Sequence, residues 1–307
     1  MATGKFWIIL NPIAGKGKAA KQLPKIERFM RKSGCDFEII LTKRPGDAPD
    51  IVRNLLLAKG DVTVAAGGDG TCNEVANGLL MRSFQTTPPI LGVLPIGRGN
   101  DFSSALGIPG DAEKAMRILL ARNVRPLDVG FLKGGLFPTG RHFVNVVGIG
   151  FDTKVVFEAA KMKIKSDLSY ALGVLITMIR YEPPPVIRMR WNENEITFPT
   201  TIVSVANGRR MGGVFYMNPN GQVDDGLFDI CALPYQKTRR KLLKVIFRYL
   251  KGTQSGYEGV RTGKGSHFHL EAIEGGMAAH CDGETVCYDG KELEISCIPS
   301  ALRVIGA

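Results

Sequence analysis

Several features that define common protein classes are missing from this sequence of 307 residues. Its six cysteines are scattered and form no C-x-x-C pair, which favours reduced thiols and a cytosolic compartment over a disulfide framework. The longest apolar run, Ala171–Ile179, is far shorter than the ~20 residues that a helix needs to span a bilayer. No charged leader with a long apolar region and a cleavage site precedes the first apolar segment at Phe6. We therefore expect neither a secreted nor an integral membrane protein.

The usual signatures of nucleic-acid and zinc binding are also missing. The chain has no RNP-like aromatic motif and no zinc-finger spacing, and its four histidines follow no metal-ligand pattern. Internal repeats and low-complexity tracts do not occur. What the chain does have is a net charge of +11, which indicates an anionic partner such as a nucleotide or an anionic membrane surface. A merely basic globular protein is the alternative.

Residues 1–127 alternate between strand and helix patterns. Continuous apolar strands separated by helices predict a doubly wound parallel sheet that is covered on both faces. The expected strands are Phe6–Leu10, Phe37–Leu41, Val62–Ala66 and Ile90–Leu94, and the expected helices cover about 17–33, 48–59, 72–82 and 111–122. Ligands of such sheets bind beyond the carboxyl ends of the strands, so the residues that follow each strand are the candidate site.

Three of these strand ends carry polar glycine loops. The loops are Asn11–Gly17, Gly67–Thr71 and Pro95–Asp101, whereas the second strand ends in Thr42-Lys43. Glycines let phosphate oxygens approach the backbone, and the first N–H groups of a following helix point at the anion. The first loop also fits a dinucleotide fingerprint, but Thr42-Lys43 replaces the acidic residue that this fingerprint requires, and no P-loop motif is present.

Asp69 is the unusual residue among these glycines. A carboxylate beside phosphate groups is repelled unless a cation intervenes, so its position indicates a bound divalent metal or a role in proton transfer. The alternative is a tight turn in which Asp69 only stabilises the start of the next helix.

The pattern changes after Pro126-Leu127-Asp128. Alternating strand-like segments separated by glycine turns predict a largely antiparallel sandwich or barrel over residues 128–297. They are Val129–Lys133, His142–Ile149, Val186–Trp191, Thr200–Ala206, Leu227–Ala232, His267–Ala272 and Thr285–Tyr288. A helical insertion is expected at about 152–181, and the segment 298–307 ends in a short strand that we expect to return to the first domain.

A second helix is expected over Lys237–Lys251. It is basic and amphipathic, as are helices that lie on anionic membranes, although a core helix with a solvated face gives the same pattern.

Five motifs together resemble the catalytic domain of the diacylglycerol kinase family. They are N-P-x-x-G at Asn11–Gly15, G-G-D-G-T at Gly67–Thr71, P-I-G-R-G-N-D-F at Pro95–Phe102, N-G-Q-V-D-D-G-L-F-D at Asn220–Asp229 and D-G-E at Asp282–Glu284. The resemblance covers nearly the whole chain and is closest to the soluble bacterial lipid kinases related to sphingosine and ceramide kinases. G-G-D-G-T by itself is shared with NAD kinases.

This resemblance implies transfer of the ATP γ-phosphoryl group to a lipid hydroxyl, in a cleft between an α/β nucleotide domain and a β-rich domain. The positions that match nucleotide contacts are Asn11, Pro12, Ile13, Ala14, Gly15, Thr42, Gly67, Gly68, Asp69, Gly70, Thr71, Cys72, Asn73, Glu74, Gly97, Arg98 and Asn100. At Arg98 the family usually has a small hydroxyl residue that contacts the nucleotide, and two alternatives stay open for the arginine in its place: it meets a phosphate, or it faces solvent.

The resemblance also places catalytic and metal-binding residues downstream. The D-G-E segment holds the base, either Asp282 or Glu284, and Asp69 completes the catalytic set. Extended backbone would direct both carboxylates to one side, whereas the alternative is a polar β-turn. Asp225, with backbone oxygens of Gln222 and Leu227, resembles a Mg²⁺ site, and hard oxygen ligands suit that ion. The alternative for D-D-G is a hairpin turn.

The sequence therefore predicts a cytosolic lipid kinase that uses ATP and Mg²⁺ and associates peripherally with the inner face of an anionic membrane. Two alternatives come from other classes: an NAD-kinase-like phosphotransferase, and a non-catalytic relative that binds nucleotide or lipid. The D-G-E segment argues against the first, and retention of Asp69, Asp282 and Glu284 argues against the second. The lipid and the oligomeric state stay open.

Overall fold

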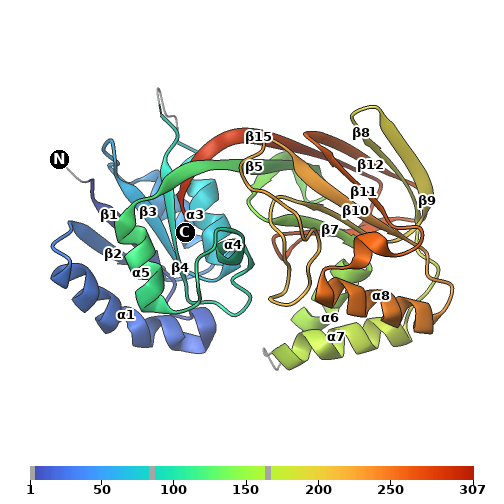
Figure 1. Ribbon diagram of the computed structural model, residues 1–307, viewed down its shortest axis with the longest axis horizontal. Coiled ribbons are helices and arrows are strands. Elements are labelled where there is room, and N and C mark those ends of the chain that lie inside the picture. Colours follow the sequence, from blue (N-terminus) through green and yellow to red (C-terminus); the bar gives the residue numbers. More distant parts are fainter. Residues whose placement is uncertain (1–3, 83–86, 163–166) are drawn as a thin grey trace. The chain divides into compact units, whose positions relative to one another are not determined.

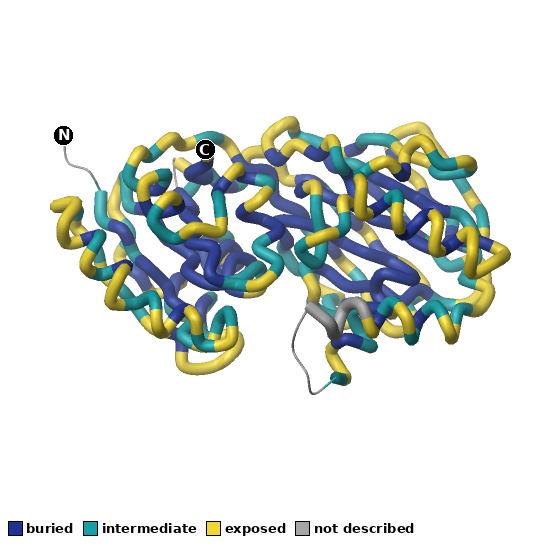
Figure 2. The backbone as a smooth tube through the Cα atoms, turned by 60° about the horizontal axis from the view of Figure 1, so that its bottom comes forward, coloured by how far each residue is buried: buried dark blue, intermediate teal, exposed yellow. Residues whose placement is uncertain are grey.

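The computed structural model describes residues 4–82, 87–162 and 167–307, and the chain divides into two compact units (Figure 1). Unit 1 comprises Met1–Val129, Val223–Asp225 and Pro299–Ala307, and unit 2 comprises Gly130–Gln222 and Gly226–Ile298. Within the described ranges, no helix is both long enough and apolar enough to cross a membrane. Each unit has its own buried interior, and Figure 2 shows the buried stretches of the chain gathered inside each unit.

Unit 1 is built on a parallel sheet with the strand order β15-β4-β3-β1-β2. These strands are β1 (Phe6–Leu10), β2 (Phe37–Leu41), β3 (Val62–Gly67), β4 (Ile90–Pro95) and the end of β15 (Glu292–Ile305). Every residue of β3 and β4 is buried, as expected for strands that are covered on both faces. The predicted parallel sheet is confirmed, and the four predicted strands match within one residue at each end.

The helices of unit 1 pack in two groups: α1 packs beside α5, and α2 packs beside α3. Their bounds are α1 (Ala14–Lys32), α2 (Asp47–Arg53), α3 (Asp69–Leu80), α4 (Asp101–Ala105) and α5 (Ala112–Ala121). The expectation of one helix over 48–59 was wrong, because α2 ends at Arg53. There the Asn54 side chain donates to the carbonyl oxygen of Asp50 at 2.9 Å, and the chain leaves the helix. The short helix α4 was not expected at all.

Unit 2 is an antiparallel β-sandwich, as predicted. Its strands are the end of β5 (Val124–Gly134), β6 (Phe137–Phe143), β7 (Val146–Gly150), β8 (Val186–Trp191), β9 (Asn194–Ala206), β10 (Phe228–Pro234), β11 (Arg261–Gly265), β12 (His267–Glu274), β13 (Met277–Cys281), β14 (Glu284–Gly290) and the start of β15. One sheet runs β14-β13-β7-β9-β10-β11, and the other contains β9, β8, β12 and β15. The long strand β9 belongs to both, since residues 194–199 pair with β8 and residues 202–206 pair with β7.

The core of unit 2 lies between these two sheets. It is formed by inward-facing apolar side chains of both sheets, among them Phe143, Val205, Phe228, Phe268 and Leu293. The outer face of β9 and β10 is covered by α6 (Phe151–Lys161), α7 (Asp167–Ile179) and α8 (Arg239–Lys251), which with these strands form a second apolar cluster. A single turn of 3-10 helix, Gln254–Gly256, follows α8.

Three expectations for unit 2 need correction. The single strand expected over His142–Ile149 is two strands, because the backbone N–H groups of residues 144–146 bind the Asp282 carboxylate. The helical insertion at 152–181 is two helices, and residues 163–166 between them lie outside the described part of the chain. Strands β11 and β13 were missed, since R-T-G-K-G and M-A-A-H-C show no alternation of apolar and polar residues.

Candidate functional site

Three loops meet at the carboxyl ends of the unit 1 strands, and we call residues 11–17, 67–71 and 96–100 the loop edge. The backbone N–H of Asn11 donates to Ala66 at 3.0 Å, and its side chain donates to the Thr71 hydroxyl at 3.2 Å. The N–H groups of Ile96 and Gly97 both donate to the carbonyl oxygen of Gly67, at 2.8 and 3.0 Å. These bonds tie the loops after β1, β3 and β4 into one surface.

Glycines make this close approach possible. A Cβ atom on Gly97 would collide with Cα of Gly68, and one on Gly15 would collide with the carbonyl oxygen of Ile96. Gly15 also has φ 59°, which disfavours other residue types. Its neighbour Lys16 takes the same left-handed conformation, so the first turn of α1 is an irregular cationic loop. At the places where a phosphate would need to approach, the loop edge therefore presents glycine backbone without side chains.

Helix α3 begins at this edge. Gly68 precedes it in an extended conformation, and no side chain caps the helix. The first N–H groups of a helix have no intrahelical acceptor, and the helix dipole adds partial positive charge there. An uncapped N-terminus in a glycine loop is an anion-binding geometry.

Asp69 lies in the first turn of α3, and its carboxylate bridges two loops. Its Oδ1 accepts a hydrogen bond from the backbone N–H of Phe102, at the start of α4, at 3.0 Å. Asp101 lies close by, because a Cβ atom on Gly99 would be 3.0 Å from Oδ2 of both Asp69 and Asp101. Asp69 therefore has a structural role in fixing α4, and the pair of carboxylates concentrates negative charge beside the Gly97–Asn100 turn.

The remaining residues that we expect to contact the nucleotide differ in how far they are buried. Ile13 and Arg98 are exposed, and Asn100 closes its turn by accepting from the N–H of Gly97 at 2.9 Å. Thr71, Cys72 and Asn73 are buried along α3.

Two candidates beside these loops are tied to the backbone. Thr42 is buried after β2, and its N–H donates to Leu10 at 3.0 Å. Glu74 accepts from the N–H of Gly46 at 3.0 Å, which links α3 to the start of α2. Nearby, hydrogen bonds from the backbone N–H of Lys43 and the side chain of Arg44 hold the pKa of Asp47 below its ordinary value.

The D-G-E segment forms the turn between β13 and β14 in unit 2. Asp282 and Gly283 have φ 48° and 84°, so the expectation of extended backbone was wrong and the turn alternative describes it. The Asp282 carboxylate accepts from the backbone N–H groups of Val144, Asn145 and Val146 at 2.9, 3.1 and 2.8 Å. Three of its roughly four acceptor positions are thus occupied by the loop between β6 and β7.

Glu284 is placed differently. Its carboxylate accepts from the Arg141 guanidinium at 2.7 Å, and its side chain is 42% exposed. A side chain thus contacts the Glu284 carboxylate, whereas backbone N–H groups contact that of Asp282.

The predicted metal loop lies between β9 and β10. Gln222 and Asp225 are exposed, and Leu227 is partly buried. The adjacent Val223 accepts from the N–H of Asp128 at 2.7 Å, and Asp224 pairs with Arg125 at 3.2 Å. No group of three or more His, Cys, Asp or Glu in the described ranges is arranged to hold a metal ion. A cation here would depend on one carboxylate, backbone carbonyl oxygens and water.

Sequence reasoning missed one buried polar pair, Asp152 and His280. Asp152 Oδ2 lies 3.4 Å from His280 Nε2, and the two side chains are 6% and 0% exposed. The available signal was a carboxylate directly after the apolar segment Gly148–Phe151, where a buried strand passes into a helix.

Comparisons with known proteins cover both units. Residues 5–132 match the diacylglycerol kinase catalytic domain, and residues 145–306 match the YegS C-terminal NAD kinase beta sandwich-like domain. A "Probable lipid kinase YegS-like" of Pseudomonas aeruginosa (strain UCBPP-PA14) is 30% identical over 96% of this chain and 93% of its own length. One of Klebsiella pneumoniae (strain 342) is 29% identical over 96% of this chain and 94% of its own length.

Solved structures agree with this result at the level of the fold. A crystal structure of a diacylglycerol kinase from Bacillus anthracis str. Sterne superposes with a TM-score of 0.71 at 22% identity, covering 100% of this chain and 98% of that one. An NAD kinase from Archaeoglobus fulgidus in complex with ATP gives a TM-score of 0.50 at 13% identity, covering 98% of this chain and 93% of that one. The chain therefore belongs to the family of YegS-like lipid kinases, whose members carry the diacylglycerol kinase catalytic domain.

Proposed function

We propose that this chain transfers the γ-phosphoryl group of ATP to the hydroxyl of a diacylglycerol-like lipid. The observation that carries this proposal is the loop edge of unit 1, where glycine loops bonded to one another lead into the uncapped N-terminus of α3. Such a surface suits a triphosphate. The ATP complex of the Archaeoglobus fulgidus NAD kinase, which shares the fold, supports ATP as the donor. The proposed nucleotide residues are those of Asn11–Gly15, Thr42, Gly67–Glu74, Gly97, Arg98 and Asn100.

Different residues contribute to different parts of the proposed reaction. Phosphoryl transfer depends mainly on positioning the two substrates and on stabilising the charge that spreads over the moving group. We assign positioning of the triphosphate to the loop edge, and the exposed Arg98 supplies a cation within it. We assign acceptance of the lipid hydroxyl proton to Glu284, because Asp282 is occupied by three backbone N–H groups. Asp282 then positions the loop between β6 and β7.

Magnesium is part of the proposal, and the available donors fit it. When bound, Mg²⁺ neutralises charge on the triphosphate and takes oxygen ligands. Asp69 and Asp101 concentrate carboxylate oxygens at the loop edge, where they would hold the ion that comes with the nucleotide. Asp225, with backbone oxygens of Gln222 and Leu227, offers a second set of hard oxygen donors, which would hold an ion without nucleotide.

We propose that the protein acts at an anionic membrane surface, the inner face of the membrane. Exposed apolar side chains follow one stripe on α7 (Leu172, Leu175 and Ile179) and one on α8 (Leu243, Phe247 and Leu250), and we call these six residues the apolar face. Cations border the stripe on α8, and Arg240, Lys241, Lys244 and Lys251 have no recorded ion pair in the described part of the chain. By contrast, Arg188 and Arg190 of β8 pair with Glu271 and Glu195. Apolar and unpaired basic residues on one helix suit an anionic bilayer.

A kinase assay tests the proposal directly. The full chain is incubated with radiolabelled ATP and Mg²⁺ and with a panel of lipids in anionic mixed micelles, including diacylglycerol, phosphatidylglycerol, a sphingoid base and a polyprenol. We expect label in a lipid product, and loss of that label with Glu284→Gln. Absence of label from every lipid, with nucleotide binding intact, would contradict the proposed reaction.

NAD is the matched control acceptor. The fold is shared with NAD kinases, and G-G-D-G-T does not separate the two groups. We expect no transfer of label to NAD under conditions that label a lipid. Transfer to NAD alone would establish the alternative function.

A further inference from the structure

A cation lies directly beside the carboxylate that the proposed function makes the base. Arg141 Nη2, on β6, donates to Oε1 of Glu284, at the start of β14, at 2.7 Å. The two side chains are 25% and 42% exposed, so neither is closed off from solvent. A substrate hydroxyl that reached Glu284 would therefore also come close to the guanidinium.

The strand that carries Arg141 is fixed on both sides of this pair. Just before β6, the backbone N–H of Leu136 donates to the carbonyl oxygen of Val286 in β14 at 2.8 Å. Just after β6, three backbone N–H groups bind the Asp282 carboxylate. The guanidinium also lies over the ring of Phe137, with 5.1 Å between Cζ and the ring centroid, and an aromatic face attracts a cation. The position of Arg141 is thus held by more than its ion pair.

The chemistry of phosphoryl transfer brings the moving group close to the base. A base accepts the proton of a hydroxyl over about 2.6–3.2 Å, and the hydroxyl oxygen attacks phosphorus from about 3–3.5 Å. One substrate oxygen therefore separates the Glu284 carboxylate from the phosphoryl group. The Arg141 guanidinium lies one hydrogen bond from that carboxylate and has five N–H donors, more than a single carboxylate takes up. It can contact Glu284 and a phosphoryl oxygen together.

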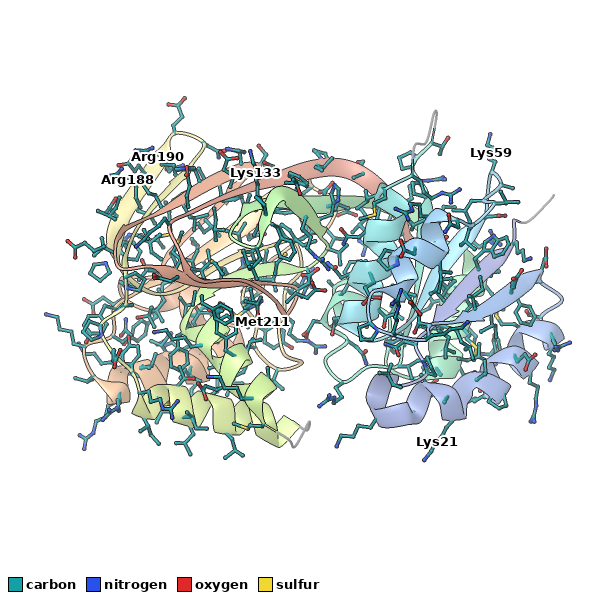
Figure 3. The ribbon with its side chains drawn as sticks, turned by 180° about the vertical axis from the view of Figure 1, so that it is seen from behind. Lys21, Lys59, Lys133, Arg188, Arg190 and Met211 are labelled. Carbon is teal, nitrogen blue, oxygen red and sulfur yellow. The ribbon has the colours of Figure 1, made fainter. Side chains whose placement is uncertain are left out.

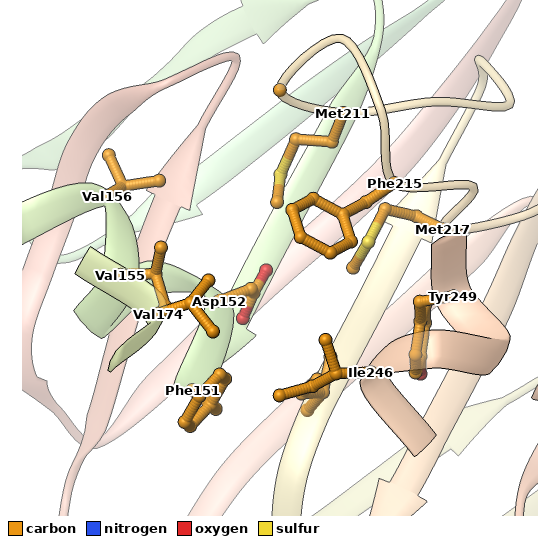
Figure 4. Close-up of a pocket in the computed structure, with 12 residues that line it drawn as sticks. Phe151, Asp152, Val155, Val156, Val174, Met211, Phe215, Met217, Ile246 and Tyr249 are labelled. Atoms are coloured by element: carbon orange, nitrogen blue, oxygen red, sulfur yellow. The ribbon is translucent and has the colours of Figure 1, made fainter. Parts of the chain in front are cut away.

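A cation at this place matches the charge that the reaction develops. Negative charge spreads over the three oxygens of the moving group, and the anionic base beside them repels it unless a cation intervenes. The apolar pocket beneath α6, α7 and α8 supplies no cation, because its lining in the described part of the chain is apolar apart from Asp152 and Tyr249 (Figure 4). Arginine suits this role, since its guanidinium stays protonated and matches the geometry of phosphate oxygens.

We propose that Arg141 is a catalytic residue that binds the γ-phosphoryl group as it moves from ATP to the lipid hydroxyl. In this step the bond between the γ-phosphorus and the ADP oxygen breaks, and ADP leaves with its electron pair. The bond between phosphorus and the lipid oxygen forms, and the hydroxyl proton goes to Glu284. The inference rests on the proposed kinase function and adds the residue of unit 2 that stabilises the transferred group.

Turnover of the full chain measures this role with a lipid that accepts label. We expect Arg141→Gln to lose ~10³-fold or more in kcat, as for other arginines that stabilise a moving phosphoryl group. Its KM values for ATP and for the lipid should change by less than about threefold, because the contact is made in the transition state. Arg141→Lys keeps the charge but not the fork of donors, so it should recover only part of the loss.

The matched control for these variants is Arg190→Gln. It removes an arginine of unit 2 that also pairs with a partly exposed carboxylate, that of Glu195, at 2.6 Å. It should turn over like the wild type. A wild-type kcat in Arg141→Gln, or an equal loss in both variants, would overturn the proposal.

A mimic of the transferred group separates contact with phosphate from mere positioning of Glu284. Aluminium fluoride with ADP and Mg²⁺ places an anion where the phosphoryl group moves, and calorimetry measures how far it tightens ADP binding. We expect ~10²-fold tightening or more in the wild type, as for transition-state analogues. Glu284→Gln should retain this tightening and Arg141→Gln should lose most of it. Tightening that persists in Arg141→Gln, or that is lost equally in Glu284→Gln, would overturn a direct contact, and so would its absence from the wild type.

The outcome is separable from that of the kinase assay. Labelled lipid from both the wild type and Arg141→Gln at equal rates would retain the kinase reaction and reject the role of Arg141. Absence of label from every lipid would reject the kinase reaction, and the fluoride measurement, which needs no lipid, would still decide whether Arg141 contacts the phosphoryl position.

Discussion

Asp69 combines a structural and a proposed catalytic role in one side chain. Its Oδ1 fixes the start of α4, and its position in the first turn of α3 brings charge to the loop edge. An asparagine retains a carbonyl oxygen that can accept from Phe102, whereas an alanine retains neither the acceptor nor the charge. The two substitutions therefore separate the roles.

We expect Asp69→Asn to fold like the wild type and to lose ~10²-fold or more in turnover, which is typical of losing a major electrostatic contribution to phosphoryl transfer. Asp69→Ala should lose the same activity and should also be less stable by about 1.5–3 kcal/mol, the value of a hydrogen bond to a charged group. Lipid phosphorylation and thermal denaturation measure the two effects. Wild-type turnover in a folded Asp69→Asn protein would remove Asp69 from the reaction.

The D-G-E carboxylates should respond in opposite ways. Asp282→Asn has one acceptor oxygen for three backbone N–H groups, so we expect a lower melting temperature. The free energy of unfolding should fall by about 1.5–3 kcal/mol for each hydrogen bond that is broken. Glu284→Gln removes the charge from a partly exposed pair with Arg141, a type of pair that contributes ~0–1 kcal/mol. It should keep its melting temperature and lose ~10²–10⁴-fold in turnover, as for loss of a general base.

One outcome of these two substitutions would reverse the assignment of the base to Glu284. If Asp282→Asn is as stable as the wild type but inactive, and Glu284→Gln is active, then Asp282 is the base and Glu284 is a surface residue. Denaturation and turnover measured on the same preparations distinguish these cases.

At the scale of the elements, α8 has three faces that follow from its sequence. Leu242, Val245, Ile246 and Tyr249 are buried, Leu243, Phe247 and Leu250 form an exposed apolar stripe, and cations occupy the remaining surface. A helix that only covered a core would need the first face and a polar remainder. The additional apolar stripe beside unpaired cations is the feature that favours a membrane.

We therefore expect the chain to co-sediment with vesicles that contain phosphatidylglycerol and to dissociate as salt is raised. The triple variant Lys241→Gln, Lys244→Gln, Lys251→Gln should bind such vesicles roughly 10²-fold more weakly at low salt, since each cation near the surface contributes about 1 kcal/mol. The matched control changes Lys21, Lys59 and Lys133 to Gln, which removes equal charge at exposed positions on other elements (Figure 3). If both triple variants weaken binding equally, α8 has no special role.

Local sequence patterns predicted those elements whose residues carry their own signal. The strands of unit 1 were found because Val62–Ala66 and Ile90–Leu94 are continuous apolar runs that must be buried on both faces. The glycine loops were found because their composition alone determines their chemistry. The break between β6 and β7 was not found, because its cause is Asp282, 138 residues away from Val144. The Asp152–His280 pair was missed for the same reason, since its two members are far apart in the sequence and only the fold brings them together.

At the scale of the whole molecule, the chain passes between its two units several times. It leaves unit 1 at 129–130 and returns to it at 298–299, and between these points a short excursion brings only Val223–Asp225 back into unit 1. Hydrogen bonds of Val223 with Asp128 and of Asp224 with Arg125 hold that excursion in unit 1. Strand β15 is attached to unit 1 in a similar way. The backbone N–H of Ser300, a residue with φ 52°, donates to the carboxylate of the buried Asp128, and the strand then pairs with β4.

The excursion loop gives the final prediction, because it separates two proposed metal roles. An ion bound by Asp225 and backbone oxygens should not need nucleotide, whereas an ion beside Asp69 should need the triphosphate to complete its oxygen shell. Mg²⁺ alone should therefore raise the melting temperature of the wild type and of Asp69→Asn, since a ligand that binds only the folded state stabilises it. Asp225→Ala should lose that rise and part of its activity. The neighbouring Asp224→Ala, which breaks only the pair with Arg125, is the matched control and should keep the rise. Thermal denaturation with Mg²⁺, with ATP plus Mg²⁺ and with a chelator decides the matter: if Asp225→Ala responds like the wild type under all three conditions, the loop is a turn and holds no metal.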